Sequence, residues 1–473
     1  MATTGPTGRP PPAGPPGTPR RTEPPDILFI LADDLGWGDL GCYGSSIRTP
    51  NLDRLAGEGM LFRHGYACSP WCSSTRIGLY TGRYPTRLPA ALEEPLTTHA
   101  QHNGIPADHQ TLPSLLLAAG YRTAMFGKWH CGWLPWYSPL RIGFQTFFGN
   151  LDGAIDYFEH VNTIGEADLY EGETSVEQTG YYTSLISERV ADFVAQDHGG
   201  PCYVQLNYTA PHWPWEGPGD REVGAEIRRR FGQEAEATPL IHRDGGSLAK
   251  YAELVEAMDA GIGTVLTALA NAGRADNTIV VFTSDNGGER WSRNWPLVGE
   301  KGDLTEGGIR VPLILRWPAA VAGGQVVDHP IDTLDLTATL VDAAGTAPDE
   351  RCPLDGVNLR PWLVDGADFP EHDLFWRTSN QGALRRGRFK YLFDRRERSV
   401  LGNWPRRDGP FHLLYDLAAD GREQADIADR HPRLTEELGA TWARIDAELL
   451  SYPPSHPGVP EPSTARPASS EPD

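Results

Sequence analysis

Two short apolar runs constrain the fold of this chain most strongly, because each ends in acidic residues. The first covers residues 26–32 and is followed by Asp33 and Asp34, and the second covers residues 278–283 and is followed by the sequence SDNGG. A continuous apolar run of this length is typical of a strand buried on both faces, as in a parallel sheet. Ligands of open α/β sheets bind at the carboxyl ends of such strands. We therefore expect the two polar endings to lie at one edge of a sheet.

Strand-like runs and helical patterns alternate along most of the chain. This alternation predicts an α/β fold with a large, mostly parallel sheet sandwiched by helices over residues 26–364. The further strand-like runs cover residues 121–126, 202–208 and 311–316, and the helical patterns cover residues 51–58, 112–119, 183–195, 248–271 and 333–343. Over residues 365–452, four short strand-like segments and one helical pattern predict a small antiparallel sheet with a covering helix. The proline-rich ends, residues 1–25 and 453–473, are predicted to be disordered tails.

The excess of acidic residues argues against a protein that binds nucleic acid or an anionic membrane. The chain has 42 Lys and Arg against 63 Asp and Glu, a net charge of −21, so any anionic ligand has to be held by a local group of cations. No apolar run approaches the roughly 18 residues that a membrane-spanning helix needs. The N-terminal residues lack the apolar core of a secretory signal, and the six cysteines form no CxxC pair. We therefore expect a cytoplasmic protein with reduced thiols.

The ends of the two apolar runs supply oxygen atoms that could bind a metal ion. They carry three carboxylates and one amide, on Asp33, Asp34, Asp285 and Asn286. Hard oxygen ligands of this kind suit Ca²⁺ or Mg²⁺, and the absence of neighbouring histidine and thiolate pairs disfavours zinc. The alternative is that both groups are polar turn residues that close two strands. Their expected position at one sheet edge favours the metal.

Two other segments carry side chains that could act on an anionic substrate. Lys128 and His130 follow the run 121–126 and are two residues apart, so in extended chain they lie on one face. A cation and an imidazole suit an anionic substrate and a proton transfer, and the alternative is a surface lysine with a hydrogen-bonded core histidine. Cys72 precedes Arg76 by four residues and could be a low-pKa nucleophile, although these residues alone favour a structural cysteine.

Seven segments of the chain form a recognisable series. In order, they read ILADDLGWGDLGCYG, TPNLDRLAGEGM, CSSTRIGLYTGR, GYRTAMFGKWH, PHWPW, FTSDNGG and KGDLTEGGIRVPLI. This series resembles the sulfatase family, the arylsulfatase-type members of the alkaline-phosphatase-like superfamily. The resemblance covers about residues 26–450 and implies an alkaline-phosphatase-like fold and hydrolysis of a sulfuric ester.

The resemblance implies a metal centre and a sulfate-binding group. The ligands of a divalent metal, usually Ca²⁺ with Mg²⁺ as the alternative, would be Asp33, Asp34, Asp285, Asn286 and the modified residue 72. The lysines that bind the sulfate would be Lys128 and Lys301. The substrate would be a small-molecule sulfate ester.

The resemblance also implies a nucleophile and its helpers. Cys72 matches the cysteine that a formylglycine-generating enzyme oxidises to formylglycine, whose hydrated aldehyde is the nucleophile. Arg76 matches the arginine that steadies this group. His130 would act as base on the second hydroxyl, and His212, which also contacts the substrate, would lie near the leaving-group oxygen.

One position departs from the family's modification motif, Cys-x-Pro/Ala-x-Arg, because Ser74 stands where the motif has proline or alanine. Two alternatives to a sulfatase stay open. One is a phosphonate monoester or phosphodiester hydrolase with the same modified cysteine, and the other is a non-catalytic sulfate-ester binder in which Cys72 is not converted. Residues 84–110 and 214–247 are expected to recognise the leaving group. Four tryptophans near the matched segments fit either a substrate cleft or packing: Trp213, Trp215, Trp291 and Trp295.

Overall fold

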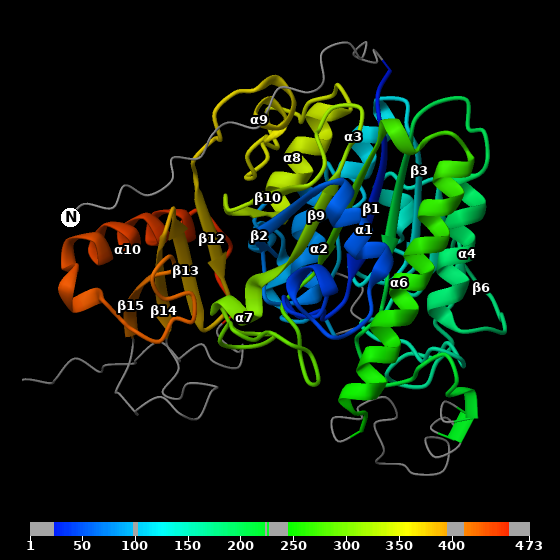
Figure 1. Cartoon of the computed structure of the whole chain (residues 1–473), viewed down its shortest axis with the longest axis horizontal. Coiled ribbons are helices and arrows are strands. Elements are labelled where there is room, and N and C mark those ends of the chain that lie inside the picture. The colour runs from blue at the N-terminus through cyan, green and yellow to red at the C-terminus, as the bar shows by residue number, and fades with distance from the viewer. Residues whose placement is uncertain (1–22, 98–102, 223–224, 227–244, 395–410, 454–473) are drawn as a thin grey trace, which may run out of the picture.

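A mixed sheet of 11 strands forms the centre of the molecule (Figure 1). The computed structural model describes residues 23–97, 103–222, 225–226, 245–394 and 411–453. The strands of this sheet are β1 (Asp26–Ala32), β2 (Met60–Tyr66), β3 (Arg122–Gly127), β4 (Thr146–Gly149), β5 (Tyr170–Glu171), β6 (Thr174–Ser175), β7 (Cys202–Asn207), β8 (Thr278–Ser284), β9 (Arg310–Arg316), β10 (Gln325–Val327) and β11 (Ile331–Asp332). They are arranged in the order β10-β2-β9-β8-β1-β7-β3-β4-β5-β6, and β11 pairs with β2.

Helices cover both faces of this sheet (Figure 1). The helices on one face are α1 (Pro50–Glu58), α4 (Tyr182–Val194) and α6 (Leu248–Asn271), and those on the other are α2 (Cys72–Thr81), α3 (Leu112–Ala118), α8 (Thr333–Ala343) and α9 (Arg360–Asp365). The central strand β1 explains why its sequence is apolar throughout. Leu28 and Ile30 belong to the first layer, whereas Ile27 and Phe29 belong to the second, because successive side chains of a strand point to opposite faces. The predicted fold class is confirmed.

The strands that lead to the polar edge all run in one direction. β1 pairs in parallel with β7 and β8, and β3 pairs in parallel with β7. β9, which covers the predicted run 311–316, is antiparallel to both β8 and β2. The sheet is therefore mostly parallel, with β9 reversed inside it and the short strand β5 reversed between β4 and β6.

A second sheet of four strands lies beside the main one (Figure 1). It consists of β12 (Asp373–Arg377), β13 (Gln381–Arg386), β14 (Phe389–Asp394) and β15 (Phe411–Asp416), paired antiparallel in this order. Helix α10 (Pro432–Asp446) packs on it through the buried side chains of Leu438 and Trp442. We call β12–β15 and α10 the C-terminal subdomain. It has the antiparallel sheet and covering helix that the sequence predicts.

Several sequence predictions fall outside the described residues. These include nearly all of the tails 1–25 and 453–473, and parts of the loops 84–110 and 214–247. Where the structure is described, none of the helices is both long enough and apolar enough to cross a membrane.

A partly buried ion pair joins the start of the C-terminal subdomain to helix α8. His372 Nε2 lies 3.0 Å from Asp335 Oδ2, next to the capping residue Asp332. Burial opposes the charged imidazole, but Asp335 outweighs it and raises the pKa of His372 to about 9. Because a raised folded-state pKa favours the protonated form, this pair stabilises the fold fully below pH 6.5 and loses its effect as the pH rises to about 9.

We therefore expect His372→Gln to remove part of the pH dependence of stability. The native chain should lose on the order of 3 kcal/mol of unfolding free energy between pH 6 and pH 9, and the variant should lose clearly less. Urea denaturation across this pH range measures the difference. Equal slopes for the two proteins would show that the pair does not contribute.

Candidate active site

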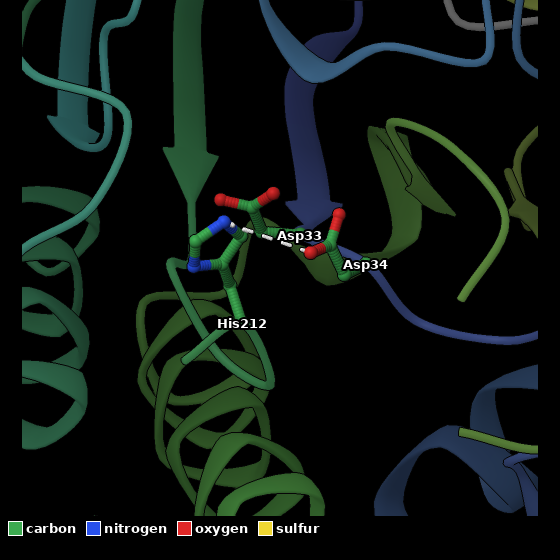
Figure 2. A group of neighbouring side chains, drawn as sticks. All are labelled: Asp33, Asp34 and His212. Carbon is green, nitrogen blue, oxygen red and sulfur yellow. Dashed lines mark ion pairs between the residues drawn. The ribbon is translucent and has the colours of Figure 1, made fainter. Parts of the chain in front are cut away.

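The polar groups predicted from the strand ends meet at one edge of the main sheet. Ala32 of β1 pairs with Ser284 of β8, so the residues that follow these strands start side by side. The two adjacent carboxylates after β1 can both reach this edge because Asp34 adopts a left-handed backbone conformation, with φ of 62°. His212, which follows β7, points toward Asp34, with its Nε2 3.6 Å from Asp34 Oδ2 (Figure 2).

Lys128 enters the same edge through a turn that requires glycine. Gly127, the last residue of β3, has φ of 101°, and a Cβ atom there would lie 1.8 Å from the carbonyl oxygen of Asn207. His130 also has a left-handed backbone, with φ of 53°. The chain therefore does not continue as a strand beyond residue 127, and Lys128 and His130 are placed by a turn rather than by the extended segment expected from the sequence.

Three buried carboxylates face three buried cations. Arg76 donates from Nε and Nη2 to Asp285 Oδ2, at 3.0 and 2.8 Å. Lys128 donates to Asp33, and Lys301 donates to Asp34 Oδ2 at 2.8 Å. The formal charges of these side chains cancel, which is how such a group can be kept away from water.

The environment shifts the pKa values of two of these carboxyl groups in opposite directions. Burial, together with the neighbouring Asp33, raises the pKa of Asp285 to about 7 although Arg76 opposes it. Burial alone would also raise the pKa of Asp34, but Lys301 and His212 outweigh it and lower the pKa below its ordinary value.

The same cluster fits a divalent cation. The Oδ1 atoms of Asp33 and Asn286 are buried and have no hydrogen-bond partner among the described residues. The amide nitrogen of Asn286 donates to Asp34 Oδ1 at 2.7 Å, which leaves the amide oxygen as the available ligand. Asp33, Asp34 and His212 each offer an atom within 4.8 Å of the others. Oxygen atoms without donors, in a group dominated by carboxylates, are what Ca²⁺ or Mg²⁺ binds.

Cys72 lies at the first turn of α2 and faces this cluster. Its Sγ and carboxylate oxygens of Asp33 and Asp285 lie within 4.8 Å of one another. Burial raises the pKa of the Cys72 thiol, against the opposing effect of Lys128 and Lys301. A thiolate nucleophile needs a lowered pKa, so the unmodified thiol of Cys72 is poorly suited to attack.

The two histidines at the edge are held in defined orientations. His130 Nε2 lies 2.8 Å from the carbonyl oxygen of Leu96, so in the neutral ring this nitrogen carries the proton. Its Nδ1 is buried with no hydrogen-bond partner among the described residues and is therefore available as an acceptor. Burial and the charge of Lys128 lower the pKa of His130 well below its usual value. In His212, Nδ1 lies 2.6 Å from the carbonyl oxygen of Trp213, which directs Nε2 to the carboxylates.

Ser74, the residue that departs from the family motif, lies away from the carboxylates. Cys72 and Arg76 share one face of α2 because they are four residues apart, and Ser74 lies on the other face. It lines a small cavity with Glu94 and Arg377, and its hydroxyl is buried without a hydrogen-bond partner in the described part of the chain. The departure at position 74 therefore leaves the side chains of the site in place.

The segment that carries Lys301 is held by the C-terminal subdomain, which the sequence did not predict. The Leu304 amide donates to Gln381 Oε1 at 3.1 Å, and the amide of Glu306, in the short helix α7 (Glu306–Ile309), donates to Glu423 Oε2 at 2.6 Å. Lys390 pairs with Glu306 at 3.0 Å and with Glu423 at 2.9 Å, and all three side chains are fully buried. Burial alone would raise the pKa of Glu306, but Lys390 and Arg310 lower it to about 2.

We expect Lys390→Met to weaken both stability and substrate binding. The change leaves Glu423 buried without a counter-charge and leaves Glu306 with Arg310, at 3.5 Å, as its ion-pair partner. This costs about 3–5 kcal/mol of unfolding free energy and loosens the segment that positions Lys301. Urea denaturation and steady-state kinetics should show lower stability and a raised KM, partly restored by Lys390→Arg. The control is Arg386→Gln, which breaks an exposed ion pair with Asp373 and should cost less than about 1 kcal/mol. An unchanged KM in Lys390→Met would show that the cluster of Lys390, Glu306 and Glu423 does not position Lys301.

Comparison with known proteins agrees with this geometry. The family model described as "Sulfatase" matches residues 25–346. Arylsulfatase J of Mus musculus is 30% identical over 486 residues, which cover 92% of this chain and 78% of that protein. N-acetylgalactosamine-6-sulfatase of Homo sapiens is 34% identical over 395 residues, which cover 78% of this chain and 72% of that protein.

Solved structures show the same fold. The crystal structure of "Ps i-CgsB in complex with k-i-k-neocarrahexaose" matches with a TM-score of 0.77 at 29% identity, covering 91% of this chain and 94% of that chain. The phosphonate monoester hydrolase of Agrobacterium radiobacter matches with a TM-score of 0.60 at 22% identity, covering 90% of this chain and 95% of that chain, a likeness that extends to the fold alone. The curated relatives support a sulfatase enzyme. The chain belongs to the sulfatase family.

Proposed function

We propose that this sulfatase hydrolyses a small-molecule sulfuric ester with a formylglycine formed from Cys72 and with a divalent cation, Ca²⁺ in preference to Mg²⁺. The observation that carries the proposal is the position of Cys72, whose Sγ lies within 4.8 Å of carboxylate oxygens of Asp33 and Asp285. An unmodified soft thiol is a poor neighbour for a hard-oxygen metal site, so conversion of Cys72 by a formylglycine-generating enzyme suits the surrounding ligands. The oxidised residue would supply a hydroxyl nucleophile, and the cation would supply the charge that favours its ionisation.

The side chains of the chain itself would bind and orient the ester. Lys128 and Lys301, buried beside the carboxylates, would hold the sulfuryl oxygens in a site of low dielectric, where charge stabilisation is strongest. The Nδ1 proton of His212 is held by the Trp213 carbonyl oxygen, so His212 would have to be doubly protonated to donate its Nε2 proton to the leaving-group oxygen. His130 Nδ1 would accept the proton of the second hydroxyl on residue 72. Arg76, fixed by Asp285, would keep residue 72 oriented toward both histidines.

The substrate class that we propose is a sulfated saccharide. The printed name of one relative is N-acetylgalactosamine-6-sulfatase, and one matching structure contains a neocarrahexaose. An acidic chain that gathers three buried cations at one edge is suited to an anionic ester of this kind.

A substrate panel tests the function. The native protein should cleave an aryl sulfate and sulfated sugars with higher kcat/KM than an aryl phosphodiester or a phosphonate monoester. A better rate on the phosphorus esters would replace the sulfatase proposal with the phosphonate or phosphodiester alternative.

Peptide mapping tests the nucleophile. In protein from its native host, the peptide over residues 66–83 should carry an aldehyde in place of the Cys72 thiol and should react with a hydrazide. Quantitative alkylation of Cys72 as a free thiol would instead support the non-catalytic binder.

A further inference from the structure

One tryptophan near the site is exposed, unlike its neighbours. Trp295 is 56% exposed, whereas the other three tryptophans that the sequence singled out, Trp213, Trp215 and Trp291, are partly or wholly buried. Trp295 lies in the loop that begins after Asn286 and ends at Lys301. The loop that carries this indole ring therefore joins a candidate metal ligand to a candidate sulfate-binding lysine.

This loop is fixed against the site rather than free. The side chain of Asn294 accepts from the Gly288 amide at 3.0 Å and donates to the carbonyl oxygens of Gly288 and Gly299, at 2.9 and 3.2 Å. The backbone of Trp295 packs on Gly38, where a Cβ atom would lie 3.0 Å from the Trp295 carbonyl oxygen. Asn294, next to Trp295 in sequence, thus ties together two glycines near the opposite ends of this loop.

An arginine of the C-terminal subdomain lies on the same ring. The guanidinium carbon of Arg422 is 4.2 Å from the centroid of the Trp295 ring. Its Nε has no hydrogen-bond partner, and no carboxylate pairs with it among the described residues. Other arginines of this subdomain do have such partners, as Arg388 has in Asp416 and Arg386 has in Asp373.

The position of Arg422 is set by its neighbour. Glu423 is fully buried, pairs with Lys390 and accepts the amide of Glu306. Arg422 is thereby anchored to the segment that also carries Lys301, with its cationic group on the indole ring. A half-buried guanidinium without a carboxylate is a ready partner for a sulfate or carboxylate group, which it can bind through two parallel hydrogen bonds.

We propose that Trp295 and Arg422 form a second subsite, which binds the sugar unit next to the one that is desulfated and requires an anionic group on that unit. This inference rests on the proposed function and adds to it the class of substrate, a polyanionic oligosaccharide rather than a single sulfated sugar. The free face of the indole ring provides a flat apolar surface for the sugar ring. Arg422 provides the charge, which matters in a chain whose net charge is −21.

Equilibrium binding in a Cys72→Ala background, where no ester is cleaved, tests the subsite by calorimetry. The probes are k-i-k-neocarrahexaose, a chondroitin sulfate hexasaccharide and galactose 6-sulfate. At least one hexasaccharide should bind about tenfold more tightly than galactose 6-sulfate, and Trp295→Ala or Arg422→Gln should remove most of this advantage. The hexasaccharide affinity of Arg422→Lys, which keeps the charge but loses the planar guanidinium, should fall between those of the unsubstituted Arg422 background and Arg422→Gln.

The matched control is Arg388→Gln, which removes the same charge from the same subdomain at a position paired with Asp416. It should leave hexasaccharide binding unchanged. The subsite is refuted if neither hexasaccharide binds better than galactose 6-sulfate, or if Trp295→Ala and Arg422→Gln keep the full advantage. Failure of the proposed function would show separately, as absent turnover of the aryl sulfate by the native protein.

Discussion

Replacing Cys72 by alanine is expected to abolish sulfate-ester hydrolysis and to leave the protein folded. The variant has no atom from which the nucleophilic hydroxyl could be made, so kcat should fall by at least about 10³-fold. Cys72 is buried at the start of a helix whose ten residues are all buried. Loss of one sulfur atom there costs only about 1 kcal/mol, because the cavity left behind is small. Turnover of an aryl sulfate and the midpoint of thermal unfolding measure the two effects.

Two further variants make this result specific. Cys68→Ala makes the same chemical change four residues earlier, at another buried cysteine whose Sγ contacts the Thr75 carbonyl, and it should keep activity. Cys72→Ser keeps one hydroxyl but lacks the second that releases the sulfuryl group, so it should give one turnover and a stable mass increase of one sulfuryl group. Retained turnover in Cys72→Ala, or unfolding of that variant, would contradict the assigned role.

The acidic edge of the sheet could be predicted because each of its strands is recognised from a short, continuous stretch of sequence. The runs that became β1 and β8 are apolar at every position, which identifies them as central strands, and parallel strands place their carboxyl ends together. From this alone Asp33, Asp34, Asp285 and Asn286 could be grouped. The mixed direction of the sheet was not predicted, because nothing in the apolar run of β9 indicates which way it runs.

The position of Cys72 could not be derived from periodicity. Helix α2 reads CSSTRIGLYT and is buried on all sides, so it lacks the one-sided apolar pattern by which a helix is recognised. Only the resemblance to sulfatases placed Cys72 and Arg76 at the site. The anchoring of Lys301 was missed for another reason, because Lys390 and Glu423 are far from Glu306 in sequence and their pairing exists only in the folded chain.

Removal of the divalent cation by a chelator is expected to abolish activity without unfolding the protein. In the cluster described above, Asp33, Asp34 and Asp285 each already have a cationic partner in Lys128, Lys301 or Arg76. Loss of the ion therefore leaves no buried carboxylate without a counter-charge, and the stability lost is limited to the binding contribution, about 2.7 kcal/mol at a hundredfold excess of ion over Kd. Activity should fall by about 10³-fold, because lysines bound to carboxylates cannot also hold sulfuryl oxygens.

Metal add-back distinguishes this explanation from damage by the chelator. Ca²⁺ should restore turnover at lower concentration than Mg²⁺, since a site rich in carboxylate and amide oxygens suits the larger ion. Asn286→Ala removes one of the two oxygens without partners and should raise the Ca²⁺ concentration for half-maximal activity by about 10–100-fold. Asp39→Asn changes another buried carboxyl, which accepts a hydrogen bond from Tyr251 at 2.6 Å, and should leave that concentration unchanged. If Asn286→Ala and Asp39→Asn respond alike, or if the chelated protein keeps its activity, the oxygen cluster is a network of ion pairs that stabilises the sheet edge and not a metal centre.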